Sequence, residues 1–257
     1  MRVIPVPCLR DNFAYLLICP QTEEVAVVDP SEPDPVLSAL DNLGLKLSAI
    51  FNTHHHYDHV GGNKALVKKY PGIKVWGHVS DRKRIPKQTE FVEEGDPVGF
   101  GKVTGSLTHN PGHTTGAVTF YFGDDAFTGD TLFAAGCGRL FEGTPEDMHR
   151  SLNHKIGARA PETRLWFGHE YTETNLRFAQ SVEPDNKDVV NKLTKVREMR
   201  AAGEWTTPTT LAEEWRTNPF MRVDSEGIQQ TVRCHDPSND LQPASVLGVI
   251  RALKDKF

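Results

Sequence analysis

Short runs of β-branched and aromatic residues, separated by turns, fill the first two thirds of the chain and predict strands. These runs occupy residues 13–19, 25–29, 47–51, 74–77, 103–107, 118–122, 126–129 and 164–167. The turn Gly123-Asp124-Asp125 predicts a hairpin between two of them, and residues 88–102 are rich in turns with short β candidates. Helical patterns cover residues 34–43, just before Gly44, and residues 65–69. Strands interleaved with helices in this way indicate an α/β (α+β) fold, in which helices cover sheets.

The pattern becomes mainly helical after residue 172. Residues 172–203 read as helix with a break at Pro184, and Thr210 to Glu213 match a capping box that begins a further short helix. A last helix is predicted near the C-terminus, with Arg251 and Lys254 on its surface and an apolar face formed by Val246, Val249, Ile250, Leu253 and Phe257. We therefore expect two domains, a mixed one over residues 1–172 and a helical one over residues 173–257.

Composition excludes several classes of protein. The 257 residues are 38% hydrophobic and 25% charged, and the net charge of −5 gives no general attraction to nucleic acid or to an anionic membrane. No run is apolar enough for a signal peptide or a transmembrane helix. The four cysteines form no Cys-x-x-Cys pair, which suits free thiols in a reducing compartment. We expect a cytoplasmic monomer that binds neither nucleic acid nor membrane.

The densest set of metal-ligand side chains is the stretch Thr-His-His-His-Tyr-Asp-His at residues 53–59. It follows the predicted strand 47–51, and loops at strand ends often form functional sites. In an extended segment His54 and His56 point the same way, which leaves Asp58 and His59 for a neighbouring ion. This spacing favours two metals over one. A solvated histidine-rich loop is the alternative interpretation.

Three more residues of ligand type follow predicted strands or turns, and each is preceded by glycine. They are His113, Asp130 and His169. A single histidine or aspartate after a strand is typical of a cap or an ordinary loop residue. Taken together with the first cluster, these three provide five histidines and two aspartates, a sufficient ligand set for two divalent ions.

The order of these motifs resembles the metallo-β-lactamase superfamily, whose fold is an αββα sandwich with a metal site at one sheet edge. Longer stretches are similar to glyoxalase II, the hydroxyacylglutathione hydrolase family. These are Thr-His-His-His-Tyr-Asp-His-Val-Gly-Gly-Asn from residue 53, Thr128-Gly129-Asp130-Thr131-Leu132-Phe133, Gly136-Cys137-Gly138-Arg139 and Gly168-His169-Glu170-Tyr171-Thr172. The resemblance extends from about Asn12 to the C-terminus and includes Asn218-Pro219-Phe220 and the ending Arg251-Ala252-Leu253-Lys254-Asp255.

The resemblance implies a thioester hydrolase that converts S-D-lactoylglutathione and water to D-lactate and glutathione, the second step of methylglyoxal detoxification. It implies one metal held by His54, His56 and His113, and a second held by Asp58, His59 and His169, with Asp130 bridging them. The nucleophile would be a hydroxide between the ions, so that Asp58 and Asp130 count as catalytic. Histidine and carboxylate ligands suit zinc, with iron or manganese as alternatives.

Substrate-binding residues are implied by the same resemblance. Positions that bind glutathione in the family are matched by Arg139, Phe141, Tyr171, Arg251 and Lys254. Phe141 departs from relatives that have tyrosine there, because it cannot donate a hydrogen bond. For Arg251 and Lys254 the alternative interpretation is that of ordinary solvated charges.

Other residues near the motifs receive weaker assignments. Asp29, at the end of a valine-rich strand, is a candidate for orienting a ligand histidine. We interpret Cys137 as a small packing residue and assign no ligand role to His55, Tyr57 or His109.

Two alternative functions come from other classes. A glutathione persulfide dioxygenase shares the fold but uses a single iron for oxidation, and the full two-metal ligand set and the helical domain argue against it. A non-catalytic metal-binding module is expected to have lost ligands, and none is missing here.

Overall fold

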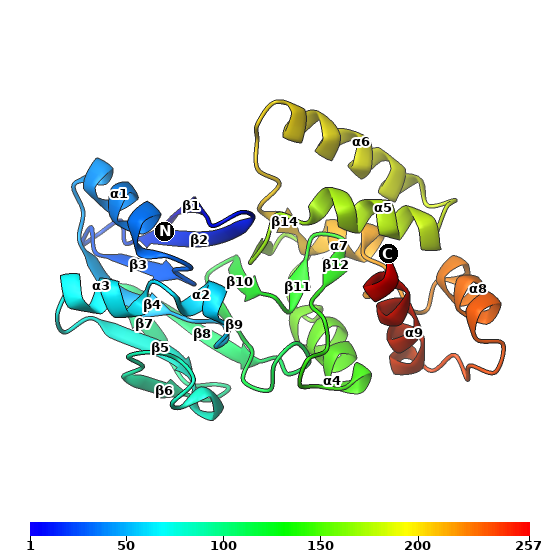
Figure 1. Ribbon diagram of the computed structural model, residues 1–257, viewed down its shortest axis with the longest axis horizontal. Coiled ribbons are helices and arrows are strands. Elements are labelled where there is room, and N and C mark those ends of the chain that lie inside the picture. Colours follow the sequence, from blue (N-terminus) through cyan, green and yellow to red (C-terminus); the bar gives the residue numbers. More distant parts are fainter. The chain divides into compact units, whose positions relative to one another are not determined.

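The computed structural model describes residues 1–257, which divide into two units. Unit 1 contains Met1–His109, Gly116–Gly129 and Trp166–His169, and unit 2 contains Asn110–Thr115, Asp130–Leu165 and Glu170–Phe257. Unit 1 is built mainly from strands and unit 2 mainly from helices (Figure 1).

The first sheet belongs to unit 1 and has the strand order β1-β2-β3-β4-β5-β6. Its strands are β1 (Arg2–Cys8), β2 (Asn12–Ile18), β3 (Val25–Val28), β4 (Leu47–Phe51), β5 (Lys74–His78) and β6 (Glu90–Val92). Strands β1, β2 and β3 pair antiparallel, and β3 to β6 pair parallel. Parallel neighbours send their carboxyl ends to the same edge, so the loop after β4 begins at an edge where sites are commonly built.

Helices α1 (Pro33–Leu43) and α3 (Asn63–Lys69) lie along one face of this sheet (Figure 1). The buried side chains of Val36, Leu40 and Leu66 join the valines, leucines and isoleucines of β1 to β5 in one apolar cluster. As predicted, α1 ends at Gly44, whose φ of 67° suits a residue without a Cβ. The short helices α2 (Tyr57–Val60) and η1 (Val79–Asp81) follow β4 and β5.

The second sheet has the order β14-β13-β10-β9-β8-β7. Its strands are β7 (Val98–Phe100), β8 (Val103–His109), β9 (Val118–Phe122), β10 (Asp125–Gly129), β13 (Arg164–Phe167) and β14 (Thr209–Thr210). The predicted hairpin at Gly123-Asp124-Asp125 is confirmed, because β9 and β10 pair antiparallel across it.

Aromatic side chains pack the two sheets of unit 1 against each other. The ring centroids of Phe51 in β4 and Phe120 in β9 lie 5.2 Å apart, and those of Tyr15 in β2 and Trp166 in β13 lie 5.4 Å apart. Edge-to-face contacts of this kind add to the stabilisation from burial. This dry interior fixes the strands whose ends carry the histidine motifs.

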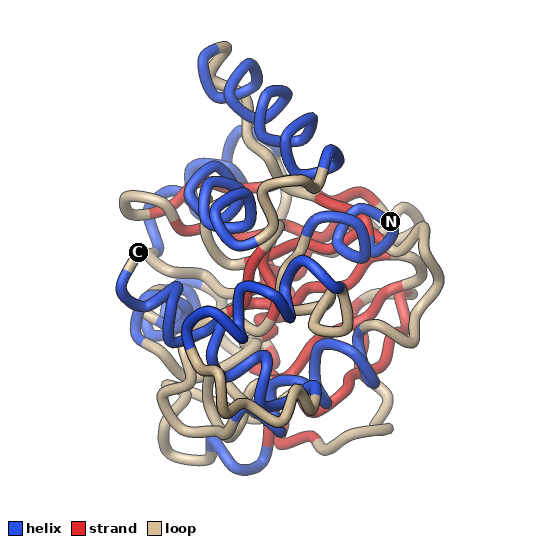
Figure 2. The backbone as a smooth tube through the Cα atoms, turned by 90° about the vertical axis from the view of Figure 1, so that its right-hand side faces the viewer, coloured by secondary structure: helices blue, strands red, loops and turns tan.

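Unit 2 contains the remaining elements. They are the hairpin β11 (Leu132–Phe133) and β12 (Gly136–Cys137), α4 (Pro145–His149) continued by a π-helix (Arg150–Ile156), α5 (Thr172–Val182), α6 (Lys187–Ala201), α7 (Leu211–Thr217), α8 (Glu226–His235) and α9 (Pro243–Lys256). Leu176 and Ala179 of α5 pack with Val189, Leu193 and Val196 of α6. The chain ends in the helix α9 (Figure 2).

The strand and helix assignments made from sequence are confirmed to within a few residues, and several further elements were missed, among them β1, α2, η1, β11, β12 and β14. Strand β1 contains Pro5 and Pro7, and proline is tolerated here because β1 lies at the edge of its sheet. The helices 145–156 and 226–235 were also not predicted.

One expectation about α9 is wrong. Its buried face consists of Val246, Leu247, Ile250 and Arg251, so Arg251 does not lie on the surface. The guanidinium tolerates burial because it is hydrogen-bonded within unit 2, as described below.

Candidate metal centre

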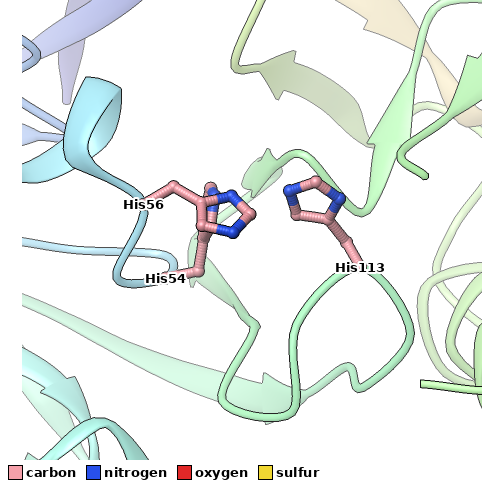
Figure 3. Close-up of side chains that lie close together, drawn as sticks. All are labelled: His54, His56 and His113. Carbon is pink, nitrogen blue, oxygen red and sulfur yellow. The ribbon is translucent and has the colours of Figure 1, made fainter. Parts of the chain in front are cut away.

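Three sets of residues place potential metal-ligand atoms within 4.8 Å of one another. They are His54, His56 and His113; Asp58, His59 and His169; and Asp29, His54 and His59. Figure 3 shows the three histidines of the first set, of which His54 and His56 belong to unit 1 and His113 to unit 2. The first two sets are the groups that the sequence motifs pointed to, and the third requires a separate interpretation.

The second set lies within unit 1, and its histidine rings are oriented by carboxylates. His59 Nδ1 is 3.0 Å from Asp29 Oδ2, and His169 Nδ1 is 2.9 Å from Asp11 Oδ1. An ionised carboxylate only accepts, so Nδ1 carries the proton in both rings and Nε2 carries a lone pair.

The two Nε2 atoms of this set lie 3.3 Å apart. With both protons on Nδ1, no hydrogen bond joins them, and two lone pairs face each other. Asp58 Oδ2 adds a negative charge 3.7 Å from His59 Nε2 and 3.4 Å from His169 Nε2. Lone pairs and a carboxylate that converge in this way fit a cation.

His54 is oriented through a hydroxyl. Its Nδ1 is 3.1 Å from Thr53 Oγ1, and Thr53 Oγ1 donates to Asp29 Oδ2 over 2.6 Å. Because the hydroxyl proton is used on Asp29, the histidine donates from Nδ1, and its Nε2 lone pair faces His56 Nδ1 at 3.1 Å. The same logic therefore places the lone pair of His54 on Nε2, the atom that faces His56 Nδ1.

Asp29 orients ligand histidines through hydrogen bonds and is not itself a ligand in our interpretation. Its carboxylate accepts from Thr53 N at 2.8 Å, from Thr53 Oγ1 and from His59 Nδ1. These bonds account for the third set of residues, and they confirm the predicted contact of Asp29 with a histidine of the cluster. Such outer partners fix the tautomer of a ligand histidine and raise its basicity.

A glycine before Asp130 is required by close packing. Gly129 has a φ of 50°, and a Cβ at this position would lie 2.2 Å from Thr53 Oγ1. Any larger residue would push Thr53 away from its contacts with His54 and Asp29. The Gly-Asp pair noted in the sequence thus has a steric reason.

Unit 2 orients His113 in the same manner. His113 Nδ1 lies 2.8 Å from the backbone carbonyl of Arg139, so Nε2 again carries the lone pair and lies 3.5 Å from Asp130 Oδ2. The ring of Phe141 packs edge-on against His113 at 5.3 Å while 61% of Phe141 remains exposed.

The donor set as a whole fits divalent metal ions. It consists of five imidazoles and two carboxylates without a thiolate, and these ligands suit zinc, iron and manganese. Four of the histidines, His54, His59, His113 and His169, have Nδ1 next to an acceptor, which directs Nε2 toward the ligand atoms.

Sequence reasoning missed Asp11, in the turn between β1 and β2, and Asn12, the first residue of β2. Asp11 orients His169, and Asn12 Nδ2 donates to Asp58 Oδ2 at 3.1 Å and to the Asp58 carbonyl at 2.9 Å. These contacts join segments 158 and 46 residues apart. A single Asp-Asn pair at the end of a turn gives no periodic signal that could have identified them.

Two of the predicted substrate residues, Arg139 and Arg251, meet at one carboxylate in unit 2. Asp255 Oδ1 is 3.0 Å from Arg251 Nη2 and 3.4 Å from Arg139 Nε. Arg251 is only 6% exposed, and its Nη1 also donates to the carbonyl of Cys137 at 2.8 Å. The side chain of Arg139 is largely exposed, so this residue keeps access to solvent.

Two further predicted substrate residues, Tyr171 and Lys254, differ in their surroundings. The ring of Tyr171 packs edge-on against Phe133 at 5.6 Å and stays partly exposed. Burial lowers the pKa of Lys254 to about 8, and the nearby charges of Arg251 and Arg177 act in the same direction.

Cys137 has the properties of a packing residue. It is buried, and this burial raises the pKa of its thiol to about 11. A thiol with a raised pKa is a poor nucleophile at neutral pH, which agrees with the interpretation made from the sequence.

Comparison with known proteins decides the family. The family model described as metallo-beta-lactamase superfamily matches residues 10–169, and that described as hydroxyacylglutathione hydrolase C-terminus matches residues 170–257. The hydroxyacylglutathione hydrolase of Synechococcus sp. (strain JA-2-3B'a(2-13)) is 48% identical over 260 residues, with all of both chains covered. The chain belongs to the hydroxyacylglutathione hydrolase family. A second member, from Rippkaea orientalis (strain PCC 8801 / RF-1), is 46% identical over 264 residues and also covers both chains fully.

Solved structures confirm the fold expected for this family. The BLEG-1 B3 metallo-beta-lactamase superposes with a TM-score of 0.67 at 22% identity, covering 86% of this chain and 100% of its own. ETHE1 from Myxococcus xanthus has the same TM-score and identity and covers 99% and 98%. The predicted metallo-β-lactamase αββα sandwich with a C-terminal helical part is therefore confirmed. None of the helices is long and apolar enough to cross a membrane.

Proposed function

We propose that this member of the hydroxyacylglutathione hydrolase family hydrolyses S-(2-hydroxyacyl)glutathione thioesters, S-D-lactoylglutathione among them. The products are a 2-hydroxy acid, here D-lactate, and glutathione. The observation that carries this proposal is the convergence of histidine lone pairs and carboxylates at the ends of the strands, in a chain whose full length matches hydroxyacylglutathione hydrolases.

The ligands divide into two groups in this proposal. His54, His56 and His113 would hold one ion, Asp58, His59 and His169 would hold the other, and Asp130 would complete the ligand set. Zinc fits these donors, as do iron and manganese. When bound, divalent ions lower the pKa of water and polarise a thioester carbonyl.

The protein's own part in the reaction is orientation and electrostatics. Asp29 and Asp11 keep the Nδ1 protons of His59 and His169 in place, so that these rings present lone pairs without rearrangement. Asn12 holds the Asp58 carboxylate through its side-chain amide. The leaving group is a thiolate, which is stable enough that no protein acid is required for the cleavage.

The glutathione part of the substrate requires positive and aromatic side chains, because it carries carboxylates. We assign its binding to Arg139, Phe141, Tyr171, Arg251 and Lys254. In this assignment residues 1–172 form the catalytic domain and residues 173–257 the substrate-binding domain.

We further propose that the protein is a cytoplasmic monomer. The four cysteines are free, and Cys8, Cys19 and Cys137 are buried, which agrees with a reducing compartment.

The direct experiment is the hydrolysis of S-D-lactoylglutathione by the purified protein, followed at the thioester absorbance together with the release of free thiol. We expect one glutathione and one D-lactate per thioester consumed. Treatment with a chelator should abolish turnover, and added zinc should restore it. If the protein holds stoichiometric metal but cleaves no thioester, the proposed activity is rejected.

A further inference from the structure

His55 lies between two proposed metal ligands and is paired with a buried aspartate. Its Nδ1 is 3.2 Å from Asp81 Oδ1, where the side chain of Asp81 is 0% exposed and that of His55 is 14% exposed. His55 has no place among the ligands, and Asp81 belongs to none of the three sets of potential ligand atoms.

The position of Asp81 is fixed from several directions. It is the last residue of η1, and its backbone carbonyl accepts from Arg84 N at 2.8 Å and Ile85 N at 3.1 Å. Its carboxylate packs on Gly116, where a Cβ would lie 2.4 Å from the carboxylate carbon. Arg84 contacts both members of the pair. Its Nη1 lies 3.5 Å from Asp81 Oδ1, and its Nη2 contacts His55 Nε2.

A carboxylate buried in this way is costly unless opposite charge lies beside it, and here His55 Nδ1 and Arg84 Nη1 lie 3.2 Å and 3.5 Å from Asp81 Oδ1, although neither carboxylate oxygen accepts a hydrogen bond of good geometry from a side chain. The pairing therefore connects the loop after β4 to η1 within unit 1. Along an extended segment, alternate side chains point to opposite sides, so restraining residue 55 also restrains residues 54 and 56. The rings of His54 and His56 stand at 80° and 66° to the ring of His55.

We propose that Asp81 is a positioning residue for the metal site formed by His54 and His56. Acting through His55, it holds the loop so that His54 Nε2 and His56 Nδ1 stay 3.1 Å apart. This inference rests on the proposed binuclear centre. The set of Asp58, His59 and His169 has Asp29, Asp11 and Asn12 as its own supports and does not depend on Asp81.

The consequence is a selective loss of one metal. In the Asp81→Ala variant we expect one of the two ions to bind about 10–100-fold more weakly, the usual effect of losing an outer partner of a metal site. The second ion should keep its wild-type affinity. Asp81→Asn retains an acceptor for His55 and should lie between the wild type and Asp81→Ala.

The experiment is a competition with a graded series of chelators, with metal per chain determined by elemental analysis. Asp124→Asn, in the exposed turn between β9 and β10, is the matched control and should bind both ions normally. Cobalt-substituted protein gives a second readout, because the visible absorption of one ion should change and that of the other should stay. Since Asp81→Ala removes a buried group and can fail to fold, His55→Ala provides an independent variant with the same expected selectivity.

Three results would overturn the positioning role. Wild-type affinity for both ions in Asp81→Asn and His55→Ala would show that the pair does not set the loop. Equal weakening of both ions would show a general loss of stability. A wild-type protein that binds no ions would reject the metal centre itself, and the positioning role with it.

Discussion

Arg251 and Asp255 form an ion pair across one turn of α9, with Arg251 Nη2 at 3.0 Å from Asp255 Oδ1. The same guanidinium donates from Nη1 to the carbonyl of Cys137 in the hairpin β11–β12. The C-terminal helix is thus fastened to the segment that lies between Asp130 and Arg139. Arg251 therefore stabilises the packing of α9 against this hairpin, in addition to any contact with substrate.

We therefore predict two effects of Arg251→Ala. The free energy of unfolding should fall by about 1–3 kcal/mol, because the variant leaves a buried carbonyl without its donor. KM for a glutathione thioester should rise about ten- to hundredfold if the guanidinium also binds the substrate carboxylate. Urea denaturation and steady-state kinetics measure the two effects separately. Unchanged stability would contradict the fastening role.

Lys254→Ala should change KM with a smaller loss of stability than Arg251→Ala, because Lys254 makes a long 3.4 Å hydrogen bond to the Thr174 carbonyl and cation–π contacts with Phe178 and Phe257. Its pKa of about 8 also predicts a pH dependence. Below pH 8 the ammonium is charged and attracts a carboxylate; above pH 8 it is neutral. KM should therefore rise between pH 7 and pH 9.

Lys254→Arg is the control for this pH dependence, since a guanidinium stays charged throughout the range. In that variant the rise of KM above pH 8 should disappear. The same rise in both proteins would assign the titration to another group.

Asp130→Ala should lose metal and nearly all turnover. The carboxylate lies 3.5 Å from His113 Nε2, and in our proposal it would be a ligand of the metal centre. The sheets should persist, because the aromatic interior of unit 1 does not involve this residue. Circular dichroism and metal analysis provide the measurement, and an active variant with its full metal content would remove Asp130 from the ligand set.

Phe141→Tyr should bind glutathione more tightly with little change in kcat. The exposed ring packs on His113 and has room for a hydroxyl, which can add one hydrogen bond of about 0.5–1.5 kcal/mol. Inhibition by glutathione and the kinetics of thioester cleavage test this. A large change in kcat would mean that the side chain touches the reacting atoms.

The residues proposed as ligands were predictable because their signal is local. Within residues 53–59 the spacing itself indicates which side chains share a direction, and the glycines before His113, Asp130 and His169 mark tight turns at strand ends. Strands such as β4 and β13 were predictable for a similar reason, since each is a short run of apolar residues next to turns.

The residues that orient the proposed ligands were not predictable, because their contacts join segments that are distant in the sequence. Asp11 reaches His169 only once β2 pairs beside β1, and Asp81 reaches His55 only once β4 and β5 lie parallel. The burial of Arg251 has the same origin. Its position in the helix was clear, but its hydrogen-bond partner Cys137 lies 114 residues earlier in the chain.

The central claim is hydrolysis of a glutathione thioester by a protein that holds two metal ions. Elemental analysis of the purified protein, combined with turnover of S-D-lactoylglutathione under anaerobic conditions, tests it most directly. We predict close to two divalent ions per chain and full hydrolysis without oxygen. One tightly held iron, with turnover of a glutathione persulfide that requires oxygen and none of the thioester, would contradict it.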